Sequence, residues 1–279
     1  LEAFAEWLLR LGSGTEPHDA DGTITLPTDR WPELCEPGGD DLDGLCEWVY
    51  GSELAGDAEW LSERAILTPL NSTVDAINKR FVDAFPGDTV VCQSADCIDE
   101  ADASAVGVEY LNSLNSLPNF PLHELHLKPR MPLMLLRNIN PTAGLCNGTR
   151  LILHEVIHGR LLKCEIATGR QRGDIVYIPR MTLDADSNLF PFKWSRRQFP
   201  VRAAFAMTIN KAQGQTLRRV GVYLPSPCFA HGQLYVAASR VGLPEHLRFA
   251  VPLDAATGTF RTRNVVYPEA LSSAPAYVL

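Results

Sequence analysis

The 279-residue sequence lacks the pattern Gly-Lys-Ser or Gly-Lys-Thr, with which many nucleotide-binding proteins close the loop that cradles phosphate groups. This absence excludes a phosphate loop of that type within these residues. Cys-x-x-Cys pairs are also absent, and the seven cysteines are widely scattered. Neither a disulfide framework nor a zinc site is therefore indicated, and we expect no metal site.

Long apolar runs are missing as well. No stretch is long enough to cross a bilayer, and no signal peptide opens the chain. These absences predict an intracellular protein with no membrane partner. The 46% of hydrophobic residues is enough to bury the core of one large domain or two modest ones.

The charges of the chain are unevenly distributed. Residues 1–122 carry 5 basic and 24 acidic side chains, whereas residues 123–222 carry 16 basic and 6 acidic ones. The whole chain has a formal net charge of −8, which by itself argues against a nucleic-acid partner. The basic segment nevertheless favours a polyanionic partner, with an ordinary basic surface as the alternative.

The most informative stretch runs from Phe205 to Val241. Residues 199–207 are apolar and predict a strand, and a dense set of hydrogen-bonding side chains follows it. This set consists of Thr208, Asn210, Lys211, Gln213, Gln215 and Thr216, with Gly214 among them. A second short strand is predicted over 220–224 and a helix over 232–241, with Arg240 near its end.

Strands that alternate with helices predict a parallel sheet, whose ligands lie beyond the carboxyl ends of the strands. The polar set after residue 207 occupies such an end. The alternative is that these side chains only cap a helix and solvate a loop.

A similar arrangement is predicted upstream. Residues 65–67 form a buried strand, a tight loop follows, and a helix begins with Asn71 as its N-cap. Thr68 and the free amides of this helix start suit a phosphate of a nucleic-acid backbone. Alternatively, Thr68 and Asn71 only cap the helix, and both roles are compatible. Short helices are also expected over 1–11 and near 42–50.

Between residues 131 and 200, closely spaced β segments are separated by Gly and Asn turns, with no convincing helix. This spacing predicts a small barrel inserted into the α/β domain. Eight polar residues are candidates for a basic rim or junction, most of them surface or packing residues and two or three of them DNA contacts: Arg137, Asn138, Asn147, Arg150, Arg170, Arg172, Arg196 and Arg197.

Two segments, TINKAQGQTL at 208–217 and YVAASRV at 235–241, resemble the fifth and sixth motifs of superfamily-one DNA helicases of the petite-integration-frequency (PIF) type, particularly the Helitron branch. Further segments resemble this family in the family's order: AILTPLNSTVDAIN at 65–78, EYLNSL at 109–114, LMLLRNINPTAGLCNGTRLIL at 133–153 and RRQFPVRAAFAMTINKAQGQT at 196–216. The resemblance covers roughly residues 60 to 252. Ala212 departs from the family's usual serine, Ala238 from its leucine, and residues 129–131 replace a glycine-containing turn.

The resemblance implies a RecA-like second motor domain with an inserted Src-homology-type barrel. It implies that Arg240 is an arginine finger on ATP, with Gly214 and Gln215 as further ATP contacts. Single-stranded DNA would be bound by Thr68, Asn71, Thr208, Asn210 and Lys211. The cofactors would be ATP and Mg²⁺, whose protein ligands come from a first motor domain outside these residues. The family moves 5′ to 3′, and its Helitron branch implies a nuclear protein.

From this resemblance we predict five segments: an N-terminal flanking segment (1–60), a first part of the motor domain (61–130), the inserted barrel (131–200), a last part of the motor domain (201–255) and a C-terminal tail (256–279). Leu1 at the start, rather than Met, suits a fragment. We therefore expect the C-terminal portion of an ATP-dependent DNA helicase that does not hydrolyse ATP alone. The alternative is a non-catalytic single-strand-binding or docking module from a truncated transposon-type helicase.

Overall fold

A computed structural model describes residues 1–51, 54, 57–98, 106–115, 117, 119–185 and 188–272. The chain forms two compact units. The first consists of Leu1–Ser52, Glu63–Val74 and Ala206–Leu279, and the second of Glu53–Ser62 and Asp75–Phe205. The second unit is thus inserted into the sequence of the first, and one division falls inside helix α4 (Asn71–Ala84).

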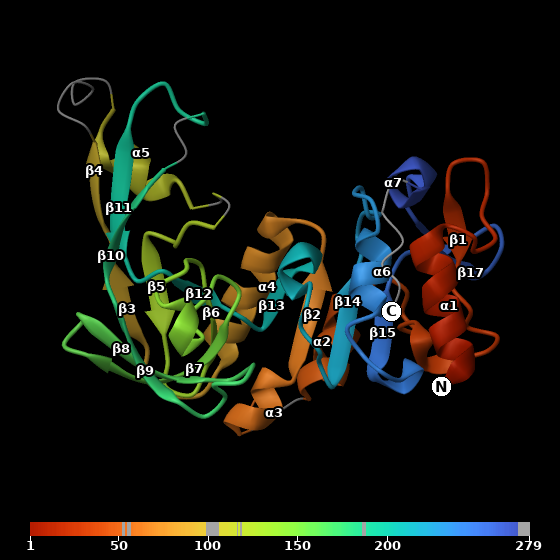
Figure 1. Ribbon diagram of the computed structural model, residues 1–279, viewed down its shortest axis with the longest axis horizontal. Helices are drawn as coiled ribbons and strands as arrows, with labels where there is room; N and C mark the ends of the chain where they lie inside the picture. The colour runs from red at the N-terminus through yellow and green to blue at the C-terminus, as the bar shows by residue number, and fades with distance from the viewer. Residues whose placement is uncertain are drawn as a thin grey trace. The chain divides into compact units, whose positions relative to one another are not determined.

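The first unit is built on a four-stranded sheet in which every pairing is parallel (Figure 1). Its strands, in order across the sheet, are β13 (Ala206–Thr208), β2 (Arg64–Thr68), β14 (Arg219–Tyr223) and β15 (Leu247–Ala250). Ile66, Val222 and Phe249 are fully buried, as expected for a parallel sheet with both faces covered. The predicted α/β fold with a parallel sheet is confirmed.

Helix α2 (Leu42–Tyr50) covers this sheet with Leu45 and Val49, which are fully buried. Asp41 caps the helix because its carboxylate accepts a hydrogen bond from the backbone N–H of Asp43. The helix approaches β14 at Gly221, where a Cβ atom would lie 2.8 Å from Val49 Cγ2. Glycine is therefore required at this position for packing.

The remaining elements of the first unit lie in its N- and C-terminal segments. They include α1 (Glu2–Ser13), α6 (Gln233–Ala238), α7 (Pro268–Ser272) and the 3-10 helices η1 (Pro32–Leu34), η4 (Ile209–Ala212) and η5 (Pro244–His246). A small antiparallel sheet joins β1 (Thr23–Thr25), β17 (Thr259–Arg263) and β16 (Leu253–Asp254). The helices predicted over 1–11 and 42–50 are confirmed.

The second unit is mostly antiparallel β-structure. Its largest sheet has the order β12 (Val201–Ala203), β6 (Pro132–Leu135), β7 (Arg150–Ile157), β8 (Leu161–Ile166) and β9 (Ile175–Pro179). A three-stranded sheet has the order β10 (Met181–Asp184), β11 (Trp194–Gln198) and β4 (Ala95–Ile98). A two-stranded sheet pairs β3 (Val90–Gln93) with β5 (Glu124–Leu127). Among the described residues, the helices of this unit include, besides α4, α3 (Ala58–Ser62), α5 (Val108–Ser113) and η3 (Pro141–Ala143).

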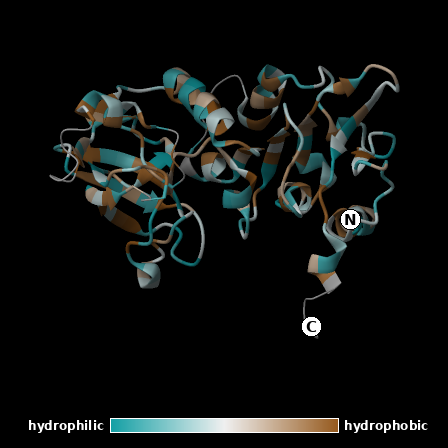
Figure 2. Cartoon of the chain, turned by 90° about the horizontal axis from the view of Figure 1, so that it is seen from above, coloured by the Kyte–Doolittle hydropathy of each residue, from teal (hydrophilic) through white to brown (hydrophobic). Residues whose placement is uncertain are grey.

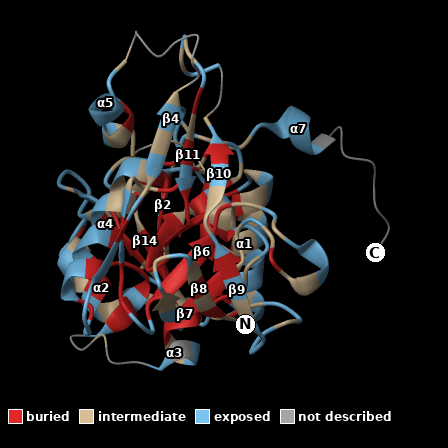
Figure 3. Ribbon diagram, turned by 90° about the vertical axis from the view of Figure 1, so that its left-hand side faces the viewer, coloured by how far each residue is buried: buried red, intermediate tan, exposed pale blue. Residues whose placement is uncertain are grey.

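Burial along β8 follows the two-residue period of a strand. Along β8, half-buried residues alternate with fully buried ones such as Leu162 and Cys164. Hydrophobic and hydrophilic segments follow one another along the ribbon (Figure 2), and the buried side of the β-structure includes β6, β7 and β8 (Figure 3). The predicted inserted β domain is confirmed as an antiparallel one. The compact unit that contains it consists of Glu53–Ser62 and Asp75–Phe205, and the division of the chain with an insertion at 131–200 stays a prediction.

Two of the eight candidates for rim, junction, surface or packing residues are fully buried, Arg150 and Arg196. Arg196 donates from Nε and Nη2 to the carboxylate of Asp96, and also to the carbonyl oxygens of Leu111 and Pro121. Arg150 donates to the carbonyl oxygens of Ser62 and Ala204, each at 2.8 Å. Both residues are therefore packing residues of the second unit, one of the roles predicted for this set.

The apolar run over 199–207 does not form the single strand predicted from it. It contains β12, which pairs antiparallel with β6, and β13, which pairs parallel with β2. Ala204 and Phe205 lie between the two strands and are fully buried. Because these two residues are as apolar as their neighbours, hydrophobicity alone does not reveal the break.

Candidate functional site

The carboxyl ends of β2 and β13 bring two candidate DNA-binding residues together. Thr68 is the last residue of β2, Thr208 is the last residue of β13, and the two are register partners across the parallel pair. Thr68 is fully buried, and its hydroxyl has no hydrogen-bond partner among the residues that the structure describes. Thr208 is half-buried. The strand ends thus place two hydroxyl-bearing side chains at one edge of the sheet.

Helix α4 begins just beyond Thr68. Its first backbone hydrogen bond runs from the N–H of Val74 to the carbonyl of Leu70, so Leu70 occupies the N-cap position. The prediction of Asn71 as N-cap is therefore wrong by one residue, and Asn71 is the first residue of the helix. The first-turn amides of a helix have no intrahelical acceptor, so this end favours an anionic group.

The loop after β13 starts with one turn of 3-10 helix. Ile209 and Ala212 are fully buried, whereas Asn210 is exposed and Lys211 is half-buried. Thr208 precedes this turn and makes no side-chain cap hydrogen bond. The two apolar residues anchor the turn, which leaves Asn210 and Lys211 on its accessible side.

The turn continues into Gly214 and Gln215. Gly214 is exposed and has φ +78, in the left-handed region that favours glycine, with open space where a Cβ would lie. Gln215 donates from its backbone to the carbonyl of Ala212 and from its side chain to the carbonyl of Lys211, both at 3.0 Å. A bulky group can thus approach the backbone at Gly214, as a phosphate contact requires.

Arg240 lies two residues beyond the end of α6 and turns back onto this loop. Its Nη1 donates to the carbonyl of Gln215 at 2.9 Å and to that of Ala212 at 3.4 Å. Nε donates to the carbonyl of Val236, and Nη2 to the hydroxyl of Ser239, both at 2.7 Å. Partial burial lowers the pKa of Arg240, but an arginine remains charged in proteins.

These contacts join the candidate residues into one site. Arg240, Gly214 and Gln215 lie at one end of the loop that follows β13, and Thr208 lies at the other end beside Thr68. The arrangement can hold two anionic ligands at the two ends of a loop fewer than ten residues long. The sequence did not indicate that Val236, Ser239 and Ala212 hold the arginine, because three of its four acceptors are backbone carbonyls.

Within the described part of the chain, no group of three or more His, Cys, Asp or Glu side chains is placed to hold a metal ion. No helix of those same residues is long and apolar enough to cross a membrane.

The parallel sheet with polar residues at its strand ends, interrupted in sequence by an antiparallel unit, defines a RecA-like domain with an inserted β domain. Residues 109–156 match the family model of the 2B domain of the DNA helicase Pif1. The matches with known proteins relate the chain to the Pif1 helicase family, in the portion that contains the 2B domain.

The chain is similar to the human ATP-dependent DNA helicase PIF1, with 35% identity over 126 residues, which are 44% of this chain and 19% of that protein. The PIF1 helicase of Xenopus laevis is 28% identical over 186 residues, 63% of this chain and 25% of the relative. The chain thus spans about a fifth to a quarter of the length of these relatives.

Two solved structures share the fold. Pif1 helicase from Candida albicans matches with a TM-score of 0.58 at 21% identity, covering 93% of this chain and 56% of that one. Pif1 helicase from Bacteroides in complex with ADP-AlF3 and single-stranded DNA matches with a TM-score of 0.56 at 17% identity, covering 91% and 51%. These comparisons do not support the narrower resemblance to the Helitron branch, which stays a prediction.

Proposed function

We propose that the chain is part of an ATP-dependent DNA helicase, in which it couples ATP hydrolysis to 5′-to-3′ movement along single-stranded DNA and to duplex unwinding. The observation that carries this proposal is the bonding of Arg240 to the loop that starts at Thr208. The same loop carries the candidate DNA contacts at one end and the candidate ATP contacts at the other. A change at the arginine therefore reaches the DNA contacts through the backbone.

The chain's own residues fit a triphosphate. The exposed backbone of Gly214 leaves room for a phosphate oxygen, and the guanidinium of Arg240 is planar and permanently charged. Such an arginine stabilises the charge that develops on a transferred phosphoryl group, an effect worth roughly 10³ to 10⁵ in rate. To do so, Arg240 exchanges some of its carbonyl acceptors for phosphate oxygens. Mg²⁺ and the lysine that binds the phosphates are supplied from outside these 279 residues, because the sequence has no Gly-Lys-Ser/Thr.

On the DNA side, the accessible candidates are the uncharged donors Asn71, Thr208 and Asn210 and the cation Lys211, whereas the side chain of Thr68 is buried. Contacts of this kind with phosphate oxygens hold the strand without reading its sequence. When Arg240 shifts its contacts on Ala212 and Gln215, Lys211 moves with them, since the Gln215 side chain donates to its carbonyl. This series of contacts couples the state of the bound nucleotide to the contacts that hold the DNA strand.

The experiment joins the chain to the phosphate-loop domain of a relative such as human PIF1. The fusion should hydrolyse ATP faster when single-stranded DNA is added, whereas the chain alone should show no hydrolysis. A fusion that binds both ligands without any DNA-stimulated hydrolysis would reject the helicase proposal.

The absence of Gly-Lys-Ser/Thr favours one second candidate, a non-catalytic single-strand-binding or docking module. Under this alternative the chain binds single-stranded DNA, yet the fusion gains no DNA-stimulated hydrolysis. The nuclear location inferred from the family resemblance stays a prediction.

A further inference from the structure

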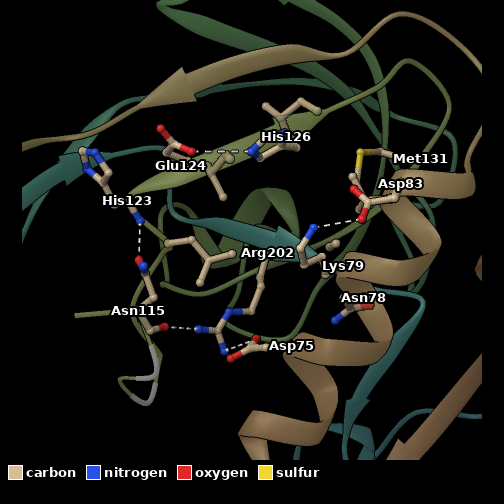
Figure 4. A pocket seen from close by; sticks show the side chains of 15 residues that line it. Asp75, Asn78, Lys79, Asp83, Asn115, His123, Glu124, His126, Met131 and Arg202 are labelled. Carbon is tan, nitrogen blue, oxygen red and sulfur yellow. Dashed lines mark hydrogen bonds and ion pairs between the residues drawn. The ribbon is translucent and has the colours of Figure 1, made fainter. Parts of the chain in front are cut away.

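The second unit contains a groove of about 400 Å³ that is lined by none of the candidate residues of the first unit (Figure 4). One wall is a single face of helix α4, because its lining residues recur at intervals of three and four: Asp75, Asn78, Lys79, Val82 and Asp83. The other walls include all four residues of strand β5, together with Leu122, Met131 and Ala203. The groove thus runs between a helix and a strand.

Strand β5 meets this groove along its edge. Glu124 and His126 are exposed, whereas Leu125 and Leu127 are buried, so the two pairs of side chains point to opposite faces of the strand. All four residues nevertheless line the groove. The edge of the strand, rather than one of its faces, therefore borders the groove.

This edge of β5 carries open backbone groups. On its other side β5 pairs with β3, and the N–H of Ser94 donates to the carbonyl of His123 at 2.8 Å. The bonds of an antiparallel pair recur at every second residue, so those of this pair skip Glu124 and His126. The N–H and C=O groups of these two residues therefore point away from β3, and they form no other backbone hydrogen bond among the described residues.

We propose that this groove binds an extended peptide of a partner protein, which adds to the edge of β5 as a third strand. A row of open N–H and C=O groups is matched by the backbone of another strand, and addition of a peptide to a sheet edge is a common mode of recognition. The four residues of β5 span roughly 13 Å, so about four peptide residues pair with it. Side chains of the peptide then pack against Val82, Leu122 and Met131.

The charges of the groove favour a cationic peptide. The charged side chains that line it are three carboxylates and two cations: Asp75, Asp83, Glu124, Lys79 and Arg202. With the two lining histidines neutral, the groove has a net charge of −1. Asp83 and Glu124 are exposed, whereas Arg202 is buried and pairs with Asp75 at 3.4 Å. We therefore expect at least one Lys or Arg in the peptide, next to the two exposed carboxylates.

The test selects peptides of about eight residues, longer than β5, from a displayed random library on the whole chain. The tightest binder is then synthesised with a methyl group on one backbone nitrogen at a time. Binding should weaken at least about tenfold at every second position and little at the positions between, because alternate N–H groups of a strand face β5. A library without binders, or a methylation series without this alternation, would overturn the proposal.

His126→Pro tests the strand edge on the protein, since proline has no N–H to donate to the peptide. Val91→Pro is the matched control. Val91 is the register partner of His126, so its N–H also lies outside the bonds between β3 and β5, but on the opposite edge of the sheet. Only His126→Pro should weaken peptide binding, by about tenfold or more, while both variants keep the melting temperature of the parent within a few degrees. Equal affinity of the two folded variants would overturn the proposal, and the methylation series decides it if His126→Pro does not fold.

Two further measurements identify the occupant. Exchange of the Lys or Arg of the peptide for Glu should weaken binding roughly two- to fivefold, and an unchanged affinity would overturn the assignment of a cationic peptide. Sedimentation of the chain alone should show a monomer. A dimer that His126→Pro dissociates would assign the edge to a second copy of the chain and overturn the proposal. Neither ATP nor DNA enters these assays, so their outcome is separate from that of the helicase proposal.

Discussion

Thr68 and Thr208 end neighbouring parallel strands and are register partners, although 140 positions separate them in sequence. One is fully buried, and the other is half-buried at the start of the loop that reaches Gln215. This pairing fixes where a strand-binding surface would begin on the first unit, and it makes the neighbouring cation Lys211 the most direct probe of that surface.

Lys211→Ala should weaken single-stranded DNA binding by the chain and reduce its salt dependence. Each phosphate neutralised contributes about −0.7 to the slope of log affinity against log salt. Loss of one contact should therefore make this negative slope shallower by about 0.7. Arg263→Ala is the control, because Arg263 is exposed and its substitution removes the same charge from a different part of the first unit. Fluorescence anisotropy at several salt concentrations measures both. Equal slopes for the two variants would remove Lys211 from the interface.

Gly221→Ala should destabilise the first unit. The added Cβ would lie 2.8 Å from Val49 Cγ2 and 2.9 Å from Leu45 Cγ, so α2 must move away from the sheet. Overpacking of this kind typically costs about 1–3 kcal/mol. Gly242→Ala is matched to it, since no atom lies within 4 Å of a Cβ there. Thermal or urea unfolding of both variants tests the close packing, which unchanged stability of Gly221→Ala would contradict.

Asp96→Ala should destabilise the second unit strongly. Asp96 and Arg196 have fully buried side chains 2.7 Å apart, and the substitution leaves the guanidinium charge without its carboxylate. Loss of one partner of a buried pair typically costs about 3–5 kcal/mol. By contrast, Lys79→Ala breaks an exposed pair and should cost no more than about 1 kcal/mol. A similar loss of stability in both variants would contradict this prediction, because the buried pair would then contribute no more to stability than the exposed one.

The parallel sheet could be predicted from sequence because its strands are short apolar runs bounded by polar clusters. The predicted strand over 65–67 falls within β2, and the one over 220–224 overlaps β14 and extends one residue beyond it; β2 and β14 are adjacent and parallel. The run over 199–207 was interpreted as one strand, since nothing in its composition marks Ala204 and Phe205 as a break. The break is set by the different sheets that β12 and β13 join, a long-range property that local hydrophobicity does not carry.

In the candidate site, too, local sequence does not reveal contacts between residues that are distant in the chain. A family motif indicated that Arg240 is important, but three of its four acceptors are backbone carbonyls, of residues up to 28 positions away. For Arg150 and Arg196 the sequence left rim, junction, surface and packing roles open, although arginine is usually exposed. Carbonyl groups distant in sequence and, for Arg196, the carboxylate of Asp96 compensate their burial, and no local pattern announces such partners.

The coupling role of Arg240 is the central claim, and Arg240→Ala in the fusion with a phosphate-loop domain tests it most directly. Loss of an arginine finger should lower the rate of ATP hydrolysis by roughly 10³-fold or more, with the affinity for single-stranded DNA changed by no more than a few-fold. Arg218→Ala, which removes an exposed arginine of the same unit, serves as the control and should retain full activity. ATP hydrolysis by Arg240→Ala at the rate of this control would contradict the account.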